Sequence, residues 1–224
     1  MPIDVDTKDC TALSDAELSE MADLCAEAGA PYDVGVLSKQ CEEWVLITQA
    51  RDGGRLAGFS FCTLERIGGT PSVLVGLASV KRSPRREAVL AAIMGDQLRR
   101  AVLAFPDEDV LVGTRLLSPS GFQALRSAED VVPRPGHKPT GEERAWGRRL
   151  AKRFGAEGRI DDRTFVLKGN RDRPPGLDFE ALKPDTVPAD VKSFFKPVDE
   201  RRGDSLVAFG WAMAEDLANL LSAK

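Results

Sequence analysis

Four positively charged side chains stand together where an apolar segment begins, in the stretch SVKRSPRREAVLAAIM at residues 79–94. They are Lys81, Arg82, Arg85 and Arg86. The amino end of a helix favours anions, so cations in its first turn are unfavourable unless something negative joins them. Arginine pairs bidentately with phosphoryl oxygens, and this stretch therefore predicts an anion site. The alternative is a solvated loop whose charges face water.

Other residues with useful chemistry are few. Histidine occurs once, at His137 in the stretch PRPGHKP, so multi-histidine metal sites are excluded and any Ser–His–Asp or Cys–His mechanism would depend on this ring. The four cysteines are far apart and form no CxxC pair, which argues against a zinc site or a redox motif. We expect no metal, a surface loop around His137, and cysteines that serve as buried packing residues.

The composition is typical of one folded domain over residues 1–224. Hydrophobic residues make up 42% and charged residues 29% of the chain, which is long enough to bury a full core. The net charge of −4 gives no overall attraction to nucleic acid or to an anionic membrane, and stacking aromatics are scarce. No apolar run approaches the roughly 20 residues that span a bilayer. We expect a cytoplasmic protein that does not bind membranes, and the composition disfavours nucleic acid as a partner.

The elements that would position these residues follow from apolar periodicity and turn residues. Ser14 with Glu17 forms a capping box, which predicts a helix that follows an extended segment and stops at Gly29. Three strand-like runs follow at 43–50, 55–66 and 72–80. The stretches RDGG and IGGTP separate them and favour tight hairpins.

The second half predicts further helices and strands. An apolar stripe predicts a helix from Arg86 to about Ala104, and VLVGTRLL after it predicts a buried strand that is parallel or adjacent to the run at 72–80. Thr140 with Glu143 predicts a helix through about Phe154. RTFVLKG is interpreted as a strand, NRDRPPGLDFEALKPDT as a loop, VPADVKSFF as a short helix, DSLVAFGWA as a strand and AEDLANLLSA as a helix. The fold class is α+β, with a mixed, mostly antiparallel sheet of about seven strands flanked by helices.

This order of elements resembles the GNAT superfamily of acyl-CoA-dependent N-acetyltransferases. Three stretches carry the resemblance. RDGGRLAGFSFCTL is similar to a hairpin of the family, SVKRSPRREAVLAAIM stands at the place of its pyrophosphate loop, and AWGRRLAKRFGAEGRIDDRTFVL is similar to its late helix. The resemblance covers about residues 5–170, and 171–224 would add a loop, a short helix, a closing strand and a terminal helix.

The resemblance implies transfer of an acetyl or other acyl group from acyl-CoA, as co-substrate, to a small-molecule or peptide amine by direct attack. The reaction would occur in a cleft where two parallel strands splay apart, and a homodimer is possible. Residues 74–80 would run along the acyl and pantetheine arm, and Arg82 to Ala88 would face the pyrophosphate. The implied binding residues are Leu77, Ala78, Ser79, Val80, Arg82, Arg85, Arg86, Glu87 and Ala88. A carboxylate or water would take the amine proton, and the candidates for catalysis are Glu42, Glu43, Glu65 and Tyr32.

The sequence departs from the family's pattern in two places. Both glycines of the pyrophosphate loop are absent from Arg82 to Ala88, and Pro84 lacks an N–H donor. Ala151 stands where many members have the tyrosine that protonates the thiolate. These losses favour an alternative function, a GNAT-like binding or regulatory module without catalysis, with or without CoA binding. Both functions remain open from the sequence.

Overall fold

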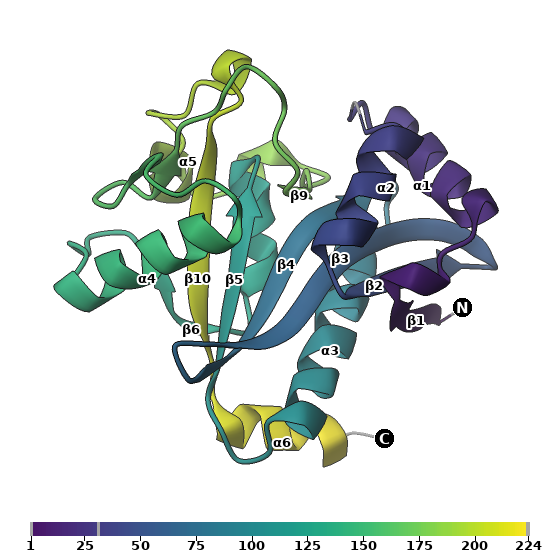
Figure 1. Ribbon diagram of the computed structural model, residues 1–224, viewed down its shortest axis with the longest axis horizontal. Helices are drawn as coiled ribbons and strands as arrows, with labels where there is room; N and C mark the ends of the chain where they lie inside the picture. Colours follow the sequence, from purple (N-terminus) through teal and green to yellow (C-terminus); the bar gives the residue numbers. More distant parts are fainter. Residues whose placement is uncertain (1, 31, 223–224) are drawn as a thin grey trace.

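The computed structural model describes residues 2–30 and 32–222, which form an open sheet with helices on both faces (Figure 1). Its strand order is β1-β2-β3-β4-β9-β5-β10-β8-β7, and β6 pairs with β10. All pairings among the described residues are antiparallel except those that β4, β5 and β9 make with one another. The α+β class is confirmed, although the sheet has 10 strands rather than about seven. Met1 and 223–224, the ends of the expected domain, lie outside the described residues.

The first part of the chain forms the meander at one side of the sheet. Its elements are β1 (Ile3–Asp9), α1 (Asp15–Glu27), α2 (Val34–Glu43), β2 (Leu46–Asp52), β3 (Arg55–Ile67) and β4 (Thr70–Val80). The expected hairpins are confirmed, and Gly53 and Gly54 turn the first one with positive φ angles of 59° and 80°.

The second part completes the sheet. Its elements are α3 (Arg86–Ala104), β5 (Val110–Leu116), β6 (Glu129–Val132), α4 (Gly141–Arg153), β7 (Ile160–Asp161), β8 (Val166–Leu167), β9 (Leu177–Asp178), α5 (Ala189–Ser193), β10 (Ser205–Ala212) and α6 (Ala214–Ser222). Short 3-10 helices occupy Cys10–Ala12, Pro119–Leu125, Pro184–Thr186 and Glu200–Arg202. Two expectations are corrected here. RTFVLKG contributes a strand of two residues, and the stretch NRDRPPGLDFEALKPDT contains β9.

The helices divide between the two faces of the sheet, with α3 on one face and α1, α2 and α4 on the other (Figure 1). Two strand glycines permit this close packing. A Cβ at Gly58 would lie 2.8 Å from a methyl carbon of Val89 on α3, and a Cβ at Gly76 would lie 2.3 Å from the ring of Trp44 at the end of α2. The sheet is therefore covered on both faces, and a ligand must enter at its edges or between its strands.

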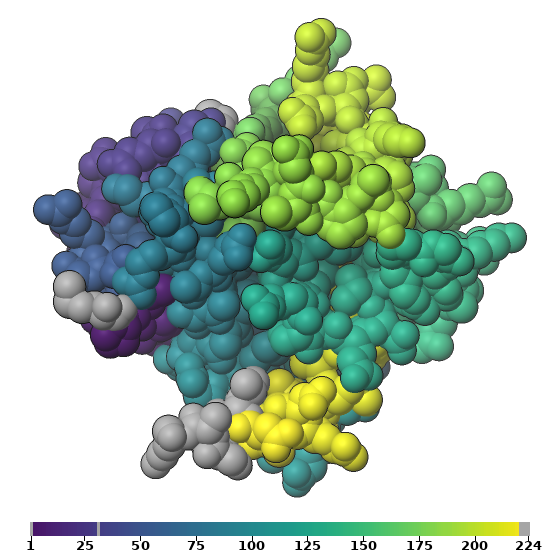
Figure 2. Space-filling model, turned by 180° about the vertical axis from the view of Figure 1, so that it is seen from behind, coloured from purple at the N-terminus to yellow at the C-terminus, as the bar shows by residue number. Residues whose placement is uncertain are grey.

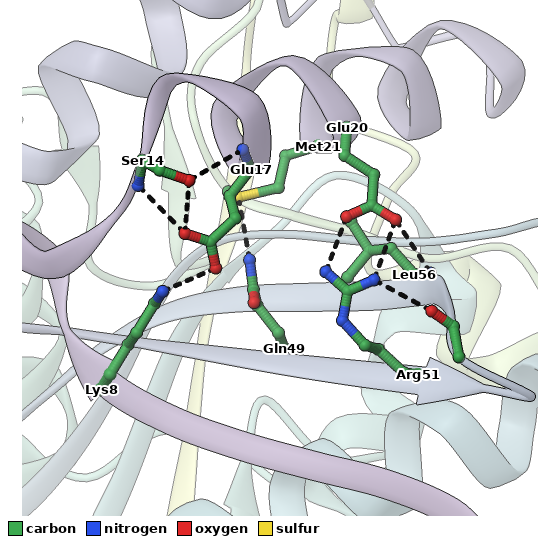
Figure 3. Close-up of polar contacts among 9 residues, drawn as sticks. Lys8, Ser14, Glu17, Glu20, Met21, Gln49, Arg51 and Leu56 are labelled. Carbon is green, nitrogen blue, oxygen red and sulfur yellow. Dashed lines mark hydrogen bonds and ion pairs between the residues drawn. The ribbon is translucent and has the colours of Figure 1, made fainter.

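Polar contacts fasten α1 to the strands beneath it (Figure 3). The Ser14 and Glu17 capping box is confirmed, and the Nζ of Lys8 on β1 lies 2.6 Å from the Oε1 of Glu17. The Lys8 ammonium and the Ser14 backbone N–H lower the pKa of Glu17 to about 2. Arg51 on β2 binds both carboxylate oxygens of Glu20, at 2.9 and 2.6 Å. The carboxylates of α1 thus fix this helix over β1 and β2.

Candidate functional site

The centre of the sheet contains the parallel pair that the strand–helix–strand unit predicts. β4 and β5 pair in parallel from Ser72 and Leu111 to Val75 and Thr114. Beyond Val75, β4 has a register shift against β3, between its pairings with Ser60 and Cys62. From that point β4 and β5 separate, which is the arrangement that the family resemblance implies for a cleft.

A segment of the same chain fills the space between the separating strands. β9 pairs in parallel with β4 on one side and with β5 on the other (Figure 1). The Ala78 N–H donates to the Gly176 carbonyl at 3.1 Å, and the Leu117 N–H donates to the Leu177 carbonyl at 3.2 Å. Leu177 has no exposed surface, and Phe179 two residues later is 1% exposed. The gap is therefore closed by backbone hydrogen bonds and by buried apolar side chains.

One side chain from elsewhere in the chain and one ion pair within the segment itself hold it in place. The Tyr32 hydroxyl donates to the Pro174 carbonyl at 2.7 Å, and the Arg173 guanidinium lies 3.0 Å from the Asp178 carboxylate. Burial raises the pKa of Tyr32 to about 12, so the phenol stays protonated at neutral pH. The only tyrosine of the chain thus contacts the segment before β9 through a hydrogen bond to its backbone.

The basic cluster at the start of α3 meets acceptors of the same chain. Its ion pairs join Lys81 to Glu27 at 2.7 Å, Arg82 to Glu180 at 3.0 Å, and Arg85 to Asp52. Arg86 is only 9% exposed and donates to the carbonyls of Ser83 at 3.1 Å and Glu180 at 2.7 Å. Seen from the back, the yellow-green chain after β9 lies against the blue-teal start of α3 (Figure 2).

The structure brings most of the expected binding residues together around β9. Leu77, Ala78, Ser79 and Val80 are buried on β4, and two of them, Ala78 and Ser79, pair with β9. Glu87 and Ala88, in the first turn of α3, are exposed. Whether acyl-CoA contacts these residues stays a prediction.

The candidate catalytic carboxylates are dispersed. Glu42 is exposed at the end of α2, and Glu65 accepts a hydrogen bond from the Nε of Arg153 at 2.6 Å. Glu43 lines a cavity and accepts from the Nε2 of Gln40 at 3.2 Å. Of these three carboxylates, Glu43 alone lines that cavity in the part of the chain that the structure describes.

This cavity, of about 590 Å³, lies beside the segment that precedes β9. Its walls come from the end of α2, the end of α4, β5 and residues 170–175. The charged residues of its lining are Glu43, Arg115, Lys152, Arg153, Arg159, Asp172 and Arg173. Sequence reasoning missed this site, and its one signal was an arginine inside the otherwise apolar run VLVGTRLL.

The cysteines are buried or half-buried, and the histidine contacts a helix cap. Cys10, Cys25 and Cys62 are buried free thiols, and burial raises the pKa of each to about 12. Their expected packing role is confirmed, whereas Cys41 is half-buried. His137 lies 2.8 Å from the Glu143 carboxylate that caps α4.

No group of three potential metal ligands occurs within residues 2–30 and 32–222, and no helix there is both long and apolar enough to cross a membrane.

Comparison with solved structures finds distant similarity to N-acetyltransferases. No protein-family model and no curated protein matches the sequence. The ribosomal-protein-S18-alanine N-acetyltransferase from Escherichia coli aligns over 94% of this chain and 95% of its own, with 10% identity and a TM-score of 0.45.

Two further solved structures align with part of this chain. An aminoglycoside 6'-acetyltransferase type Ii aligns over 58% of this chain and 86% of its own, at 13% identity and a TM-score of 0.42. An aminoglycoside N-acetyltransferase in complex with CoA aligns over 49% and 75%, at 16% identity and a TM-score of 0.37. The likeness is distant and concerns architecture.

Proposed function

We propose that this chain is a ligand-binding module with a GNAT-like architecture, which neither binds acyl-CoA between its splayed strands nor transfers acyl groups. The observation that carries this proposal is β9. The family resemblance assigns residues 74–80 to the pantetheine arm, and Ala78 and Ser79 on this stretch are hydrogen-bonded partners of β9 instead. Arg82 and Arg86, expected to face the pyrophosphate, hold Glu180. These contacts support the proposal, because they occupy the groups that acyl-CoA would need.

The energy needed to displace β9 supports this proposal. Exposing Leu177 and Phe179 costs about 1.5–3 kcal/mol each, and each of the two backbone hydrogen bonds contributes about 0.5–1.5 kcal/mol. A ligand that enters between β4 and β5 must offset about 4–9 kcal/mol. Even the lower value weakens binding by roughly a thousandfold, because each 1.4 kcal/mol is a factor of ten.

Acyl transfer is the second candidate function, and one observation favours it. β4 and β5 run parallel as far as Val75 and Thr114 and then separate, and the segment between them forms a strand of only two residues. If β9 left this gap, a cleft of the expected kind would open. Acyl-CoA would then be the donor and an amine the acceptor, with Glu43 as the candidate base nearest a cavity.

We also propose a cytoplasmic location. The four cysteines of the chain are free thiols, and free thiols persist in reducing compartments.

Calorimetry with acetyl-CoA tests the proposed function. We expect no saturable heat with the wild-type protein and no release of free thiol from acetyl-CoA across a panel of amines. The variant with Arg82, Arg85 and Arg86 all changed to alanine is the control, and it should behave like the wild type. Binding by the wild type that this triple variant loses would overturn the proposal. Amine-dependent thiol release would establish acyl transfer instead.

A further inference from the structure

Arg115 is a buried cation in the middle of the sheet. It lies on β5 and is 6% exposed. Its Nε donates to the Ser205 Oγ at 2.6 Å, but its two terminal NH2 groups have no hydrogen-bond partner among the described residues. No carboxylate of those residues lies within 4 Å of its guanidinium. Burying a charge is costly unless it is paired, so this arrangement calls for a compensating anion.

A second arginine faces the same cavity. Arg159 donates to the Gly155 carbonyl at 2.8 Å and has no ion pair within residues 2–30 and 32–222. Burial and the nearby Arg159 lower the pKa of Arg115 to about 10, and the group is still charged at neutral pH. Two positive charges without an ion pair among the described residues therefore line the same cavity.

The other cations of the lining are already paired. Arg153 binds Glu65, Arg173 binds Asp178, and Lys152 lies 3.5 Å from Glu157. The acids of the lining are Glu43 and Asp172, and neither forms an ion pair with Arg115 or Arg159 in the described part of the chain. Arg115 and Arg159 are thus the cations of the lining that have no ion pair among the described residues.

The cavity also offers space and apolar surface. Its volume of about 590 Å³ lies within the range of roughly 300–1,000 Å³ that is usual for small-molecule sites. The rings of Trp44 and Phe154, with centroids 6.3 Å apart, and Pro174 line it. An organic molecule can pack its body against these residues while its charged end reaches the arginines.

We propose that this cavity binds a small organic molecule through an oxyanion group, a carboxylate or a phosphate, held by the terminal NH2 groups of Arg115 and by Arg159. Both groups match the planar fork of a guanidinium. This inference rests on the proposed function, because it names the class of ligand that the module binds. Pro174 and Pro175 belong both to the cavity wall and to the segment before β9, so a bound ligand adjoins the closed strand gap.

Calorimetry and thermal unfolding with three probes test the inference: inorganic phosphate, citrate and benzoate, each at an ionic strength matched with sodium chloride. We expect saturable binding and a higher Tm for at least one probe, and the comparison of phosphate with the two carboxylates identifies the preferred group. Arg115→Gln and Arg159→Gln should weaken that binding by about tenfold or more, because a hydrogen bond to a charged group contributes about 1.5–3 kcal/mol. The matched control Arg163→Gln removes an exposed arginine outside the cavity and should bind like the wild type.

Failure to bind any probe at millimolar concentration would overturn the inference, as would binding that neither cavity variant weakens. If Arg115→Gln does not fold, Arg159→Gln decides, since Arg159 is half-buried and its side chain bonds only the Gly155 carbonyl among the described residues. The two proposals fail separately. If acetyl-CoA binds and the binding depends on Arg82, Arg85 and Arg86, the proposed function is wrong. If neither acetyl-CoA nor any of the three anions binds, only the proposed class of ligand is wrong.

Discussion

Replacing Leu177 with alanine measures how firmly β9 is inserted between β4 and β5. Leu177 has no exposed surface and pairs with Ala78 on one side and Leu116 on the other. Its Cδ2 also packs against the position of Gly121, where a Cβ would lie 3.3 Å away. Truncating a fully buried leucine costs about 2–5 kcal/mol, and we expect Leu177→Ala to lower the free energy of unfolding by that amount. Leu182→Ala, five residues later and 50% exposed, is the matched control and should change it by less than about 0.5 kcal/mol.

Urea titrations give the change in global stability, and hydrogen exchange localises it. The N–H groups of Ala78 and Leu117 donate to carbonyls of the β9 segment, so their protection depends on its insertion. If β9 opens by itself, a loss of 2 kcal/mol lowers their protection about 30-fold. Equal unfolding free energies for wild type and Leu177→Ala, with unchanged protection at both amides, would refute the closed strand gap.

Three further predictions concern packing, charge and thiol reactivity. A Cβ at Gly76 would lie 2.3 Å from an indole ring, so Gly76→Ala should lower the free energy of unfolding by about 1–3 kcal/mol in urea titrations. Gly95 lies on α3, and a Cβ there would have no neighbouring atom within 4 Å, so Gly95→Ala should raise the free energy of unfolding by about 0.5–1 kcal/mol. Because the pKa of Glu17 falls from 4.5 to about 2 on folding, its stabilisation is present above pH 4.5 and is lost as pH falls toward 2; Glu17→Gln should lower Tm at pH 7 and not at pH 2. A thiol reagent should label half-buried Cys41 first in the folded protein and all four cysteines in denaturant.

Each of these has a contradicting result. Similar losses of stability in the two glycine variants would mean that the strand glycine does not face a ring. A Tm difference for Glu17→Gln that persists unchanged at pH 2 would exclude the ion pair as its source. Fast labelling of more than one thiol in the folded protein would contradict the burial of the other three.

Helices and hairpins were predictable because their signals lie within a few residues of one another. The capping boxes at Ser14 and Thr140 mark the starts of α1 and α4, and the apolar stripe from Arg86 to Ala104 matches α3. Glycine pairs mark the hairpins of the meander. In each case the interactions that fix the element are local, so the sequence alone contains them.

The short strands β6 and β9 were not predictable for the opposite reason. β9 has two residues and follows a proline-rich stretch, and its extended form depends on hydrogen bonds to β4 and β5 at once. β6 likewise is a strand only through its pairing with β10. Propensity cannot reveal such strands, because their partners are distant in the chain.

The order of the main elements, the fold class and the cations at the start of α3 that require negative partners all follow from the amino-acid sequence. The folded chain was needed to see that its own carboxylates supply such partners to Lys81, Arg82 and Arg85, and that β9 closes the gap beside them. The fold also brings Arg115 and Arg159 to one cavity, where Arg115 has no carboxylate partner among the described residues. The physical reason is that pairing and burial depend on which distant segments meet, whereas capping, turns and periodicity depend on neighbours in the sequence.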